Sequence, residues 1–163
     1  MQERAYKNML SFMLRHKIFK NIAIILGKTI TISVYVFYPL FLAYLYSIKS
    51  PESFKITIIP LVSFIILSVV RYFLNFPRPY EKYDIKPLYN KKTKGKSCPS
   101  RHTFSAFVIG FCVMYVSLPL GALIVGLAAI LAVSRVLCGI HFIRDVVWGF
   151  AAAVLSALTG LLF

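Results

Sequence analysis

Long apolar segments alternate with shorter polar ones along most of the 163-residue chain. Five of the apolar segments are long enough to be candidate membrane spans, since crossing a hydrocarbon core takes roughly 20 helical residues. They are residues 29–48, 56–74, 103–118, 120–137 and 142–163. The third is short and begins in polar sequence, and Pro119 marks the turn into the fourth. The pattern predicts an all-α integral membrane bundle of about five spans.

The N-terminal residues 1–20 have a different pattern. Met9, Phe12, Met13 and Phe19 are interspersed with Arg and Lys. This spacing is typical of an amphipathic helix that lies in the membrane interface, and a frayed basic tail is the alternative. No short apolar core followed by a small-residue cleavage site is present, so we do not interpret the segment as a cleaved signal peptide.

The connections between the predicted spans are short, with one exception. Residues 75–100 are rich in Pro, Tyr and Lys, too polar to cross a membrane and too long for a simple turn. Loops of this length often carry function. Without internal repeats, residues 1–163 are expected to form one membrane-embedded domain, with 75–100 as its active-site loop.

Small residues recur in the fourth and fifth predicted spans. Lipid offers no hydrophobic drive for helix association, and small residues allow the helix backbones to approach closely. The residues are Gly121, Gly126, Ala128, Ala129, Ala132, Gly149, Ala151, Ala152 and Ala153.

Composition agrees with a bilayer as solvent. The chain is 59% hydrophobic, too apolar for an ordinary soluble domain of its size. Its net charge of +14 would suggest nucleic acid in a soluble protein, but the basic residues gather in 1–28 and 78–101. Anionic lipid headgroups are therefore the expected partner, and nucleic acid is not. The three cysteines have no metal-ligand spacing and are expected to be free thiols, with a Cys98–Cys138 bridge as the alternative.

Charged residues inside apolar segments cost at least about 2.5–3.5 kcal/mol each, so each needs a partner or a task. Asp145 is the only carboxylate after Asp84, and it follows His141 by four residues. On a helix the two share one face, and the carboxylate can then hold one ring nitrogen while the other attacks an electrophile. A capping pair at a helix start is the simpler interpretation.

Three arginines lie at the ends of apolar segments: Arg71, Arg78 and Arg135. Together they could grip a phosphoryl group with bidentate hydrogen bonds, although each alone could be a snorkelling interfacial residue. Ser100 is expected to cap the helix that follows the polar loop, whose opening amides would form an anion site. His102, one turn further, could donate a proton to a leaving oxygen.

In order and spacing, these residues resemble the signature of the type 2 phosphatidic acid phosphatase superfamily. The motif Lys-x6-Arg-Pro corresponds to Arg71-x6-Arg78-Pro79, and Pro-Ser-Gly-His corresponds to Pro99-Ser100-Arg101-His102. The third motif, Ser-Arg-x5-His-x3-Asp, corresponds to Ser134-Arg135-x5-His141-x3-Asp145. Arg71 replaces the usual Lys, and Arg101 replaces the usual Gly.

The resemblance implies a role for each matched residue. His141 would be the nucleophile that forms a phosphohistidine, Asp145 its orienting partner, and His102 the acid that protonates the leaving group. Phosphate oxygens would be held by Arg71, Arg78, Arg135, Ser100 and the Arg101 amide. No metal or other cofactor is expected, because arginines take the place of a cation. The superfamily also includes soluble haloperoxidases, against which the apolar composition argues, and vanadate is expected to inhibit.

The function expected is hydrolysis of a lipid phosphomonoester or pyrophosphate: phosphatidylglycerophosphate, phosphatidic acid or a polyprenyl pyrophosphate. The alternative is a non-catalytic binder or transporter of anionic lipids, which would need the arginines but not both histidines. No oligomeric state is predicted.

The expected location is a bacterial cytoplasmic membrane. The resemblance implies an extracytoplasmic site, which we favour. The Lys- and Arg-rich segments 1–28 and 78–101 instead favour the cytoplasmic side by the positive-inside rule.

Overall fold

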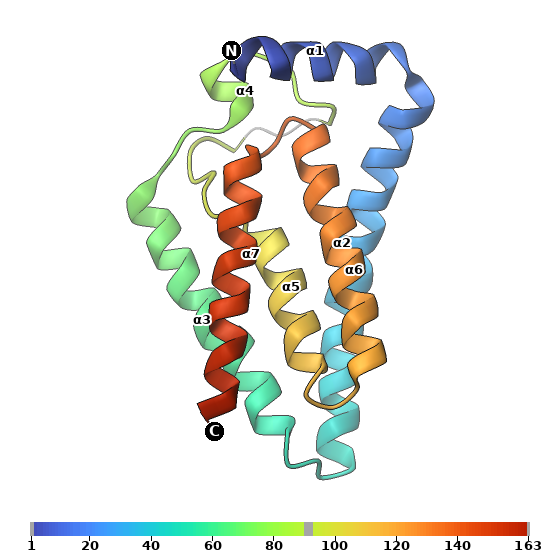
Figure 1. The fold of residues 1–163 in the computed structure, drawn as a ribbon, viewed down its shortest axis with the longest axis vertical. Helices are drawn as coiled ribbons and strands as arrows, with labels where there is room; N and C mark the ends of the chain where they lie inside the picture. The colour runs from blue at the N-terminus through green and yellow to red at the C-terminus, as the bar shows by residue number, and fades with distance from the viewer. Residues whose placement is uncertain (1, 90–92, 163) are drawn as a thin grey trace.

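The structure is a computed structural model that describes residues 2–89 and 93–162, and all regular structure in these ranges is helical. The prediction of an all-α bundle is confirmed (Figure 1). The helices are α1 (Gln2–Arg15), α2 (Lys17–Ser47), α3 (Ser53–Leu74), α4 (Pro79–Lys82), α5 (Arg101–Val113), α6 (Leu118–Leu137), α7 (Ile143–Leu158) and the 3₁₀ helix η1 (Thr159–Leu162).

Within the described residues, four helical segments are long and apolar enough to cross a membrane. They are Lys17–Ser47, Ser53–Lys82, Leu118–Leu137 and Ile143–Leu162. The third predicted span is instead the 13-residue α5. At 1.5 Å per residue, α5 extends about 20 Å, which is less than the hydrocarbon thickness of about 30 Å.

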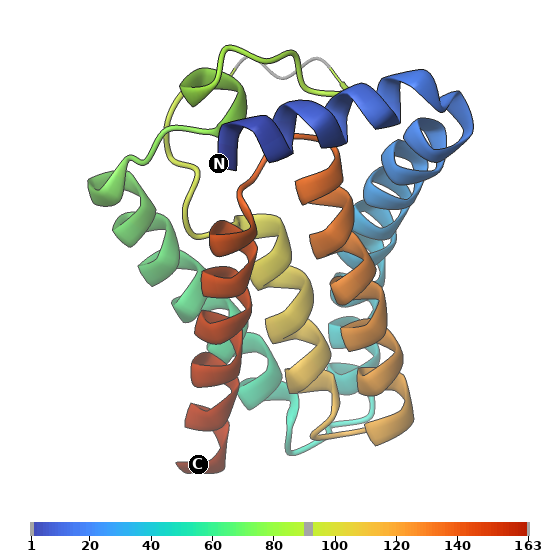
Figure 2. The same ribbon diagram turned by 45° about the horizontal axis from the view of Figure 1, so that its top comes forward.

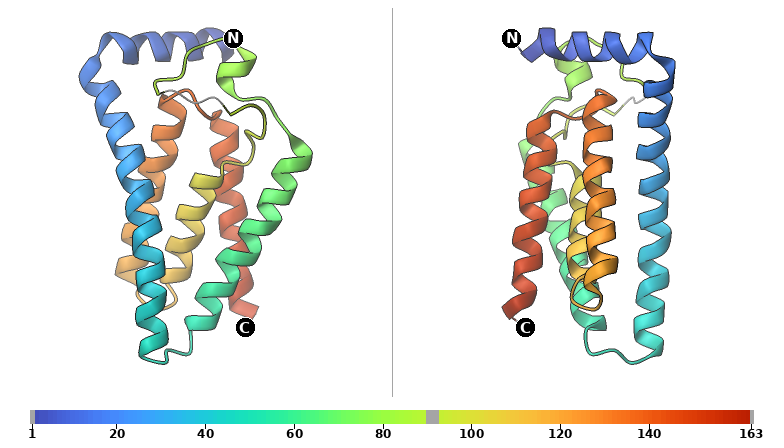
Figure 3. Two further views of the ribbon diagram at one scale, coloured as in Figure 1. Left: turned by 180° about the vertical axis from the view of Figure 1, so that it is seen from behind. Right: turned by 45° about the vertical axis from the view of Figure 1, so that its right-hand side comes forward.

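Helix α5 occupies the centre of the bundle, between α3, α6 and α7 (Figure 3). Every residue from Thr103 to Gly110 is buried, whereas the outer faces of the surrounding helices expose large apolar side chains such as Phe73, 79% exposed. An apolar outer surface is the arrangement expected of a protein in lipid. The start of α5 lies below the end of α6 and the start of α7 (Figure 1), so loop residues 93–100, the descending loop, run down into the bundle to reach it.

Helix α1 crosses the end of the bundle instead of continuing along it (Figure 2). It buries Tyr6, Leu10 and Met13, whose spacing of four and three residues puts them on one face. This confirms the predicted N-terminal amphipathic helix over the frayed tail. The predicted boundaries were wrong: the helix ends at Arg15, and α2 begins at Lys17 instead of Thr29.

Two glycines allow close helix contact as predicted. A Cβ on Gly121 of α6 would lie 2.6 Å from the Met114 nitrogen, and one on Gly149 of α7 would lie 2.9 Å from the Ser100 oxygen. Gly126, also predicted to serve packing, is exposed, and a Cβ there would meet no atom within 4 Å. Cys98, Cys112 and Cys138 are buried free thiols in the part of the chain that the structure describes.

Candidate active site

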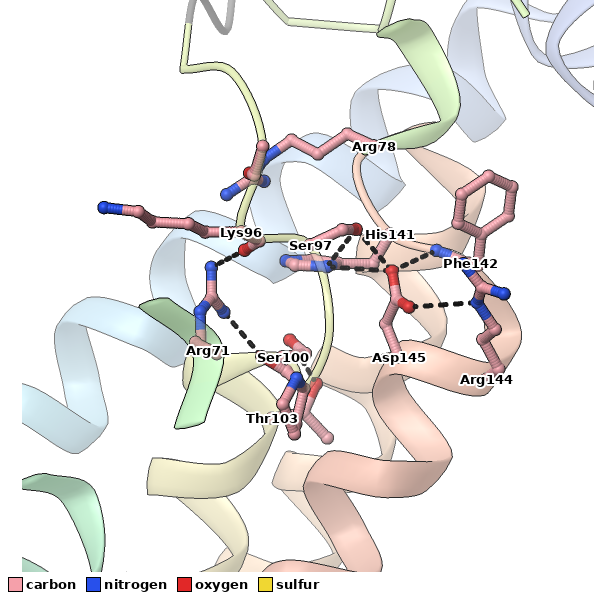
Figure 4. Close-up of polar contacts among 12 residues, drawn as sticks. Arg71, Arg78, Lys96, Ser97, Ser100, Thr103, His141, Phe142, Arg144 and Asp145 are labelled. Carbon is pink, nitrogen blue, oxygen red and sulfur yellow. Dashed lines mark hydrogen bonds and ion pairs between the residues drawn. The ribbon is translucent and has the colours of Figure 1, made fainter. Parts of the chain in front are cut away.

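The sequence motifs converge at the end of the bundle that α1 covers. They come from the end of α3, from Arg78 just before α4, from the loop that enters α5, and from the turn between α6 and α7 (Figure 4).

The turn between α6 and α7 positions His141. Helix α6 ends at Leu137, and Gly139 takes a φ of +71°, a conformation that favours glycine. The chain then folds back, and the His141 amide donates to the Arg135 carbonyl at 3.3 Å. Helix α7 begins only at Ile143. The prediction that His141 and Asp145 share one helix face was therefore wrong, because His141 precedes the helix.

His141 and Asp145 nevertheless form a pair. Nδ1 of His141 lies 3.5 Å from Oδ2 of Asp145, and the two side chains are 2% and 0% exposed. The same Oδ2 accepts a hydrogen bond from the Phe142 amide at 3.0 Å. Asp145 thus both caps the start of α7 and faces the imidazole.

Ser97, which the sequence interpretation missed, completes this cluster. Its hydroxyl donates a hydrogen bond to Oδ2 of Asp145 and lies 3.5 Å from Nδ1 of His141. Ser97 is fully buried in the descending loop. The bond holds the carboxylate beside the ring and ties the loop to α7.

The environment keeps His141 neutral. Burial lowers the pKa of His141 to about 4, and the positive charges of Arg78 and Arg71 add to this effect, against the opposing influence of Asp145. A neutral imidazole carries the lone pair that a nucleophile requires.

Arg71 and Arg78 are both buried near His141 and both hold the descending loop. Arg71 donates from Nη1 to the Pro99 carbonyl at 2.6 Å and from Nη2 to the Lys96 carbonyl. Arg78 donates from Nε to the Gly95 carbonyl at 3.1 Å. Its buried Nη1 has no hydrogen-bond partner among the described residues.

The third predicted arginine is arranged differently. Nη1 of Arg135 donates to the Tyr89 hydroxyl at 2.5 Å, and Nη2 donates to Oγ1 of Thr31 at 2.7 Å. Its guanidinium is thereby held on the side of α2, whereas Arg71 and Arg78 flank the descending loop. Tyr89 and Thr31 were not predicted to take part.

The start of α5 carries the remaining predicted residues. Ser100 is the N-cap residue, as expected, but its amide donates to the Asp145 carbonyl at 2.9 Å and its hydroxyl accepts from Thr103 at 3.0 Å. The Ser100 amide is therefore not available to a phosphate. The Arg101 side chain is exposed and lies 6.0 Å from the centre of the Phe64 ring. His102 is half-buried and borders a small cavity beside Thr31 of α2.

Glu81 is another residue that the sequence interpretation missed. Its carboxylate accepts hydrogen bonds from the Gly95 amide at 2.9 and 3.0 Å and from the Arg78 amide at 3.2 Å. The position of Glu81 three residues after Arg78 was an available signal, because an acidic residue at that spacing often closes the first turn of a helix. Here it also anchors the loop that Arg78 holds.

Fold and site together define an integral membrane helical bundle that closes over a buried His–Asp pair beside buried arginines. The sequence profile of the PAP2 superfamily matches residues 52–163, and the chain belongs to this superfamily. It is a membrane lipid phosphatase by class. No curated protein matches the sequence significantly.

Solved structures share the fold, among them the following two. LpxE from Aquifex aeolicus superposes with a TM-score of 0.77 at 21% identity, covering 98% of this chain and 94% of its own. The first transmembrane PAP2 type phosphatidylglycerolphosphate phosphatase from Bacillus subtilis gives 0.74 at 16% identity, covering 98% of this chain and 82% of its own.

Proposed function

We propose that this membrane protein removes phosphate from a lipid phosphomonoester or pyrophosphate through a phosphohistidine on His141. The observation that carries the proposal is a buried histidine kept neutral next to a carboxylate that is itself held by Ser97 and the Phe142 amide. A nucleophilic imidazole needs both features, whereas a site that only binds anions needs neither.

In the first step, Nε2 of His141 attacks phosphorus, and the bond from phosphorus to the leaving oxygen breaks. His102 gives its proton to that oxygen, which leaves as a lipid alcohol or a lipid monophosphate. Positive charge develops on the imidazole, and Asp145 compensates it from 3.5 Å. In the second step, His102 takes a proton from water, which attacks the phosphohistidine and releases inorganic phosphate.

Charge on the phosphoryl oxygens would be compensated by Arg71, Arg78 and Arg135, assisted by the Ser100 hydroxyl and the Arg101 amide. The open Nη1 of Arg78 supports this, because a buried guanidinium nitrogen without a partner among the described residues is ready to receive an anion. Guanidinium groups around the nucleophile would repel a metal cation, so we propose that the reaction is metal-independent.

Phosphatidylglycerophosphate, phosphatidic acid and polyprenyl pyrophosphates are the proposed substrates. Phosphatidylglycerophosphate is the first to assay, because the similar Bacillus subtilis protein is a phosphatidylglycerolphosphate phosphatase. We further propose that the protein works in a bacterial cytoplasmic membrane with its site on the extracytoplasmic side.

The test is turnover of these lipids by purified protein in detergent with a metal chelator present. His141→Ala and His102→Ala are each expected to lose nearly all phosphate release, whereas His16→Ala, at the exposed junction of α1 and α2, should retain it. With ³²P-labelled substrate, label retained on His141 in His102→Ala would support this division of roles. Wild-type turnover in either variant would contradict the assignment, and lipid binding without turnover by the wild-type protein would favour the binder or transporter.

A further inference from the structure

A cavity of about 350 Å³ opens beside the proposed site, which is a volume within the usual range for small-ligand sites, about 300–1,000 Å³. It lies between the end of α3, the loop residues 93–96 and the start of α5. No carboxylate borders it among the described residues. Five basic residues do: Arg71, Arg78, Lys94, Lys96 and Arg101.

Two buried polar atoms that border this cavity have no hydrogen-bond partner among the described residues. They are Oγ of Ser68 and Nη1 of Arg78. A buried donor left unpaired costs roughly 1–3 kcal/mol, so such atoms are uncommon without a reason. Both residues line this basic cavity, which indicates that it receives an anionic ligand.

The cavity is separate from the nucleophile but adjoins it. His141 and Ser100 do not border it, whereas Arg71 and Arg78 are close enough to His141 to influence its pKa. In Figure 4 the Lys96 side chain points away from His141, and the backbone of Lys96 and Ser97 runs between that side chain and the imidazole. Arg71 and Arg78 therefore stand between the reacting phosphate and the cavity.

More positive charge lines the cavity than one phosphate needs. A phosphomonoester carries a charge of about −1.5 to −2 at neutral pH, which Arg71 and Arg78 can balance. Lys94, Lys96 and Arg101 add three further positive charges around the cavity. Of these, Arg101 stands where the superfamily motif has glycine, so this side chain departs from the motif.

We propose that this cavity is a second anion subsite, which binds a second phosphate group of the same lipid headgroup next to the phosphate that is transferred. The inference rests on the proposed function. It selects, among the proposed substrates, those with two phosphates: a lipid pyrophosphate, or a headgroup with a phosphodiester beside the phosphomonoester. The shared chemistry is a pair of phosphates, one facing His141 and one facing Lys94 and Arg101.

The kinetic test uses lipids that differ by one phosphate. The pairs are polyprenyl pyrophosphate with polyprenyl monophosphate, and phosphatidylglycerophosphate with phosphatidic acid. We expect the wild-type protein to favour the two-phosphate member in kcat/KM, and Lys94→Gln and Arg101→Gln each to reduce that preference roughly tenfold, mainly through KM. The matched control is Lys86→Gln, which removes the same charge from an exposed position outside the cavity.

An unchanged preference in both cavity variants would overturn the proposal, and so would an equal loss in Lys86→Gln. The second anion could also come from free phosphate. In that case added inorganic phosphate would accelerate hydrolysis of the one-phosphate lipid, and that result would also overturn the proposal.

A binding arm separates failure of the subsite from failure of the proposed function. Calorimetric titration of the detergent-solubilised wild-type protein with inorganic pyrophosphate and with inorganic phosphate needs no turnover. We expect tighter binding of pyrophosphate, reduced roughly tenfold in Lys94→Gln and Arg101→Gln but not in Lys86→Gln. Equal affinities for the two anions would refute the subsite even if the enzyme were active.

Discussion

The hydroxyl of Tyr6 donates a hydrogen bond to the backbone carbonyl of His141 at 3.1 Å. The bond joins α1 directly to the turn that carries the proposed nucleophile. The Tyr6 ring packs edge-on against Phe142, with ring centres 5.4 Å apart, and Leu10 buries the next turn of α1 against the same region. Burial raises the pKa of Tyr6 to about 12, so the phenol stays a donor at physiological pH. Helix α1 therefore supports the turn that carries His141 as well as covering it.

Replacing Tyr6 with Phe should reduce kcat about two- to tenfold, the effect of losing a hydrogen bond with a net value of about 0.5–1.5 kcal/mol. KM should change little, because Tyr6 acts through the His141 backbone and not on the substrate. Steady-state kinetics on a lipid phosphate would measure both parameters.

Tyr83→Phe is the control, since Tyr83 belongs to the same aromatic cluster, with its ring centre 6.0 Å from that of Tyr6. This variant should keep wild-type kcat. Equal losses in the two variants would mean that the cluster acts only through packing, and an unaffected Tyr6→Phe would remove the positioning role.

Ser97→Ala should reduce kcat roughly ten- to a hundredfold, because hydrogen bonds to charged groups contribute about 1.5–3 kcal/mol. The variant leaves Asp145 with the Phe142 amide but removes the hydroxyl that holds the carboxylate beside the imidazole. If Ser97 positions Asp145, the pH dependence of kcat should also shift. Ser156→Ala serves as the control, since its hydroxyl donates within α7 to the Ala152 carbonyl. A Ser97→Ala enzyme with normal kcat and pH profile would refute the role.

Hydrophobic patterning predicted the helical bundle well but placed some boundaries badly. Residues 17–28 contain three lysines, which hid the continuation of α2 from a search for apolar runs. In the structure the lysines face outwards or lie half-buried, while Ala23 and Gly27 of the same segment are buried, so the helix continues through them. Helix α5 is shorter than its predicted span because it ends at Val113 and the chain then turns towards Ser117.

Spacing along the sequence brought out His141 and Asp145, yet it could not show how they meet. A separation of four residues fits a shared helix face, and also the turn and capped helix start that the structure contains. Ser97 and Tyr6 were missed for a different reason. Their contacts span 48 and 135 residues, and one serine in a polar loop or one tyrosine in a basic helix carries no local signal of such partners.

Acid should destabilise the protein through His141. The folded pKa is lowered to about 4 from the ordinary 6.5, so the unfolded chain binds a proton that the folded chain excludes. The stability that this group contributes is therefore present above about pH 6.5 and is lost as the pH falls towards 4. Over that range the equilibrium constant for unfolding rises by up to about tenfold per pH unit. Thermal unfolding in detergent at about pH 7 and about pH 5 should show a smaller loss in His141→Gln than in wild type. Equal losses would place the histidine in a less buried or less positive environment.

Gly149→Ala should impair catalysis out of proportion to its size. A Cβ at this position would lie 2.9 Å from the Ser100 carbonyl, and that atom is backbone, which cannot swing aside as a side chain does. The clash would push α7 away from the start of α5 and disturb the hydrogen bond from the Ser100 amide to the Asp145 carbonyl. We expect kcat to fall at least about tenfold, since a displacement of about 1 Å can cost a hundredfold in rate.

Gly126→Ala is the matched control, because a Cβ there meets nothing within 4 Å and alanine is favoured over glycine in a helix by about 1 kcal/mol. Comparing kcat and thermal stability of the two variants separates the effects. If Gly149→Ala kept full activity, the contact between α7 and Ser100 would not be what positions Asp145.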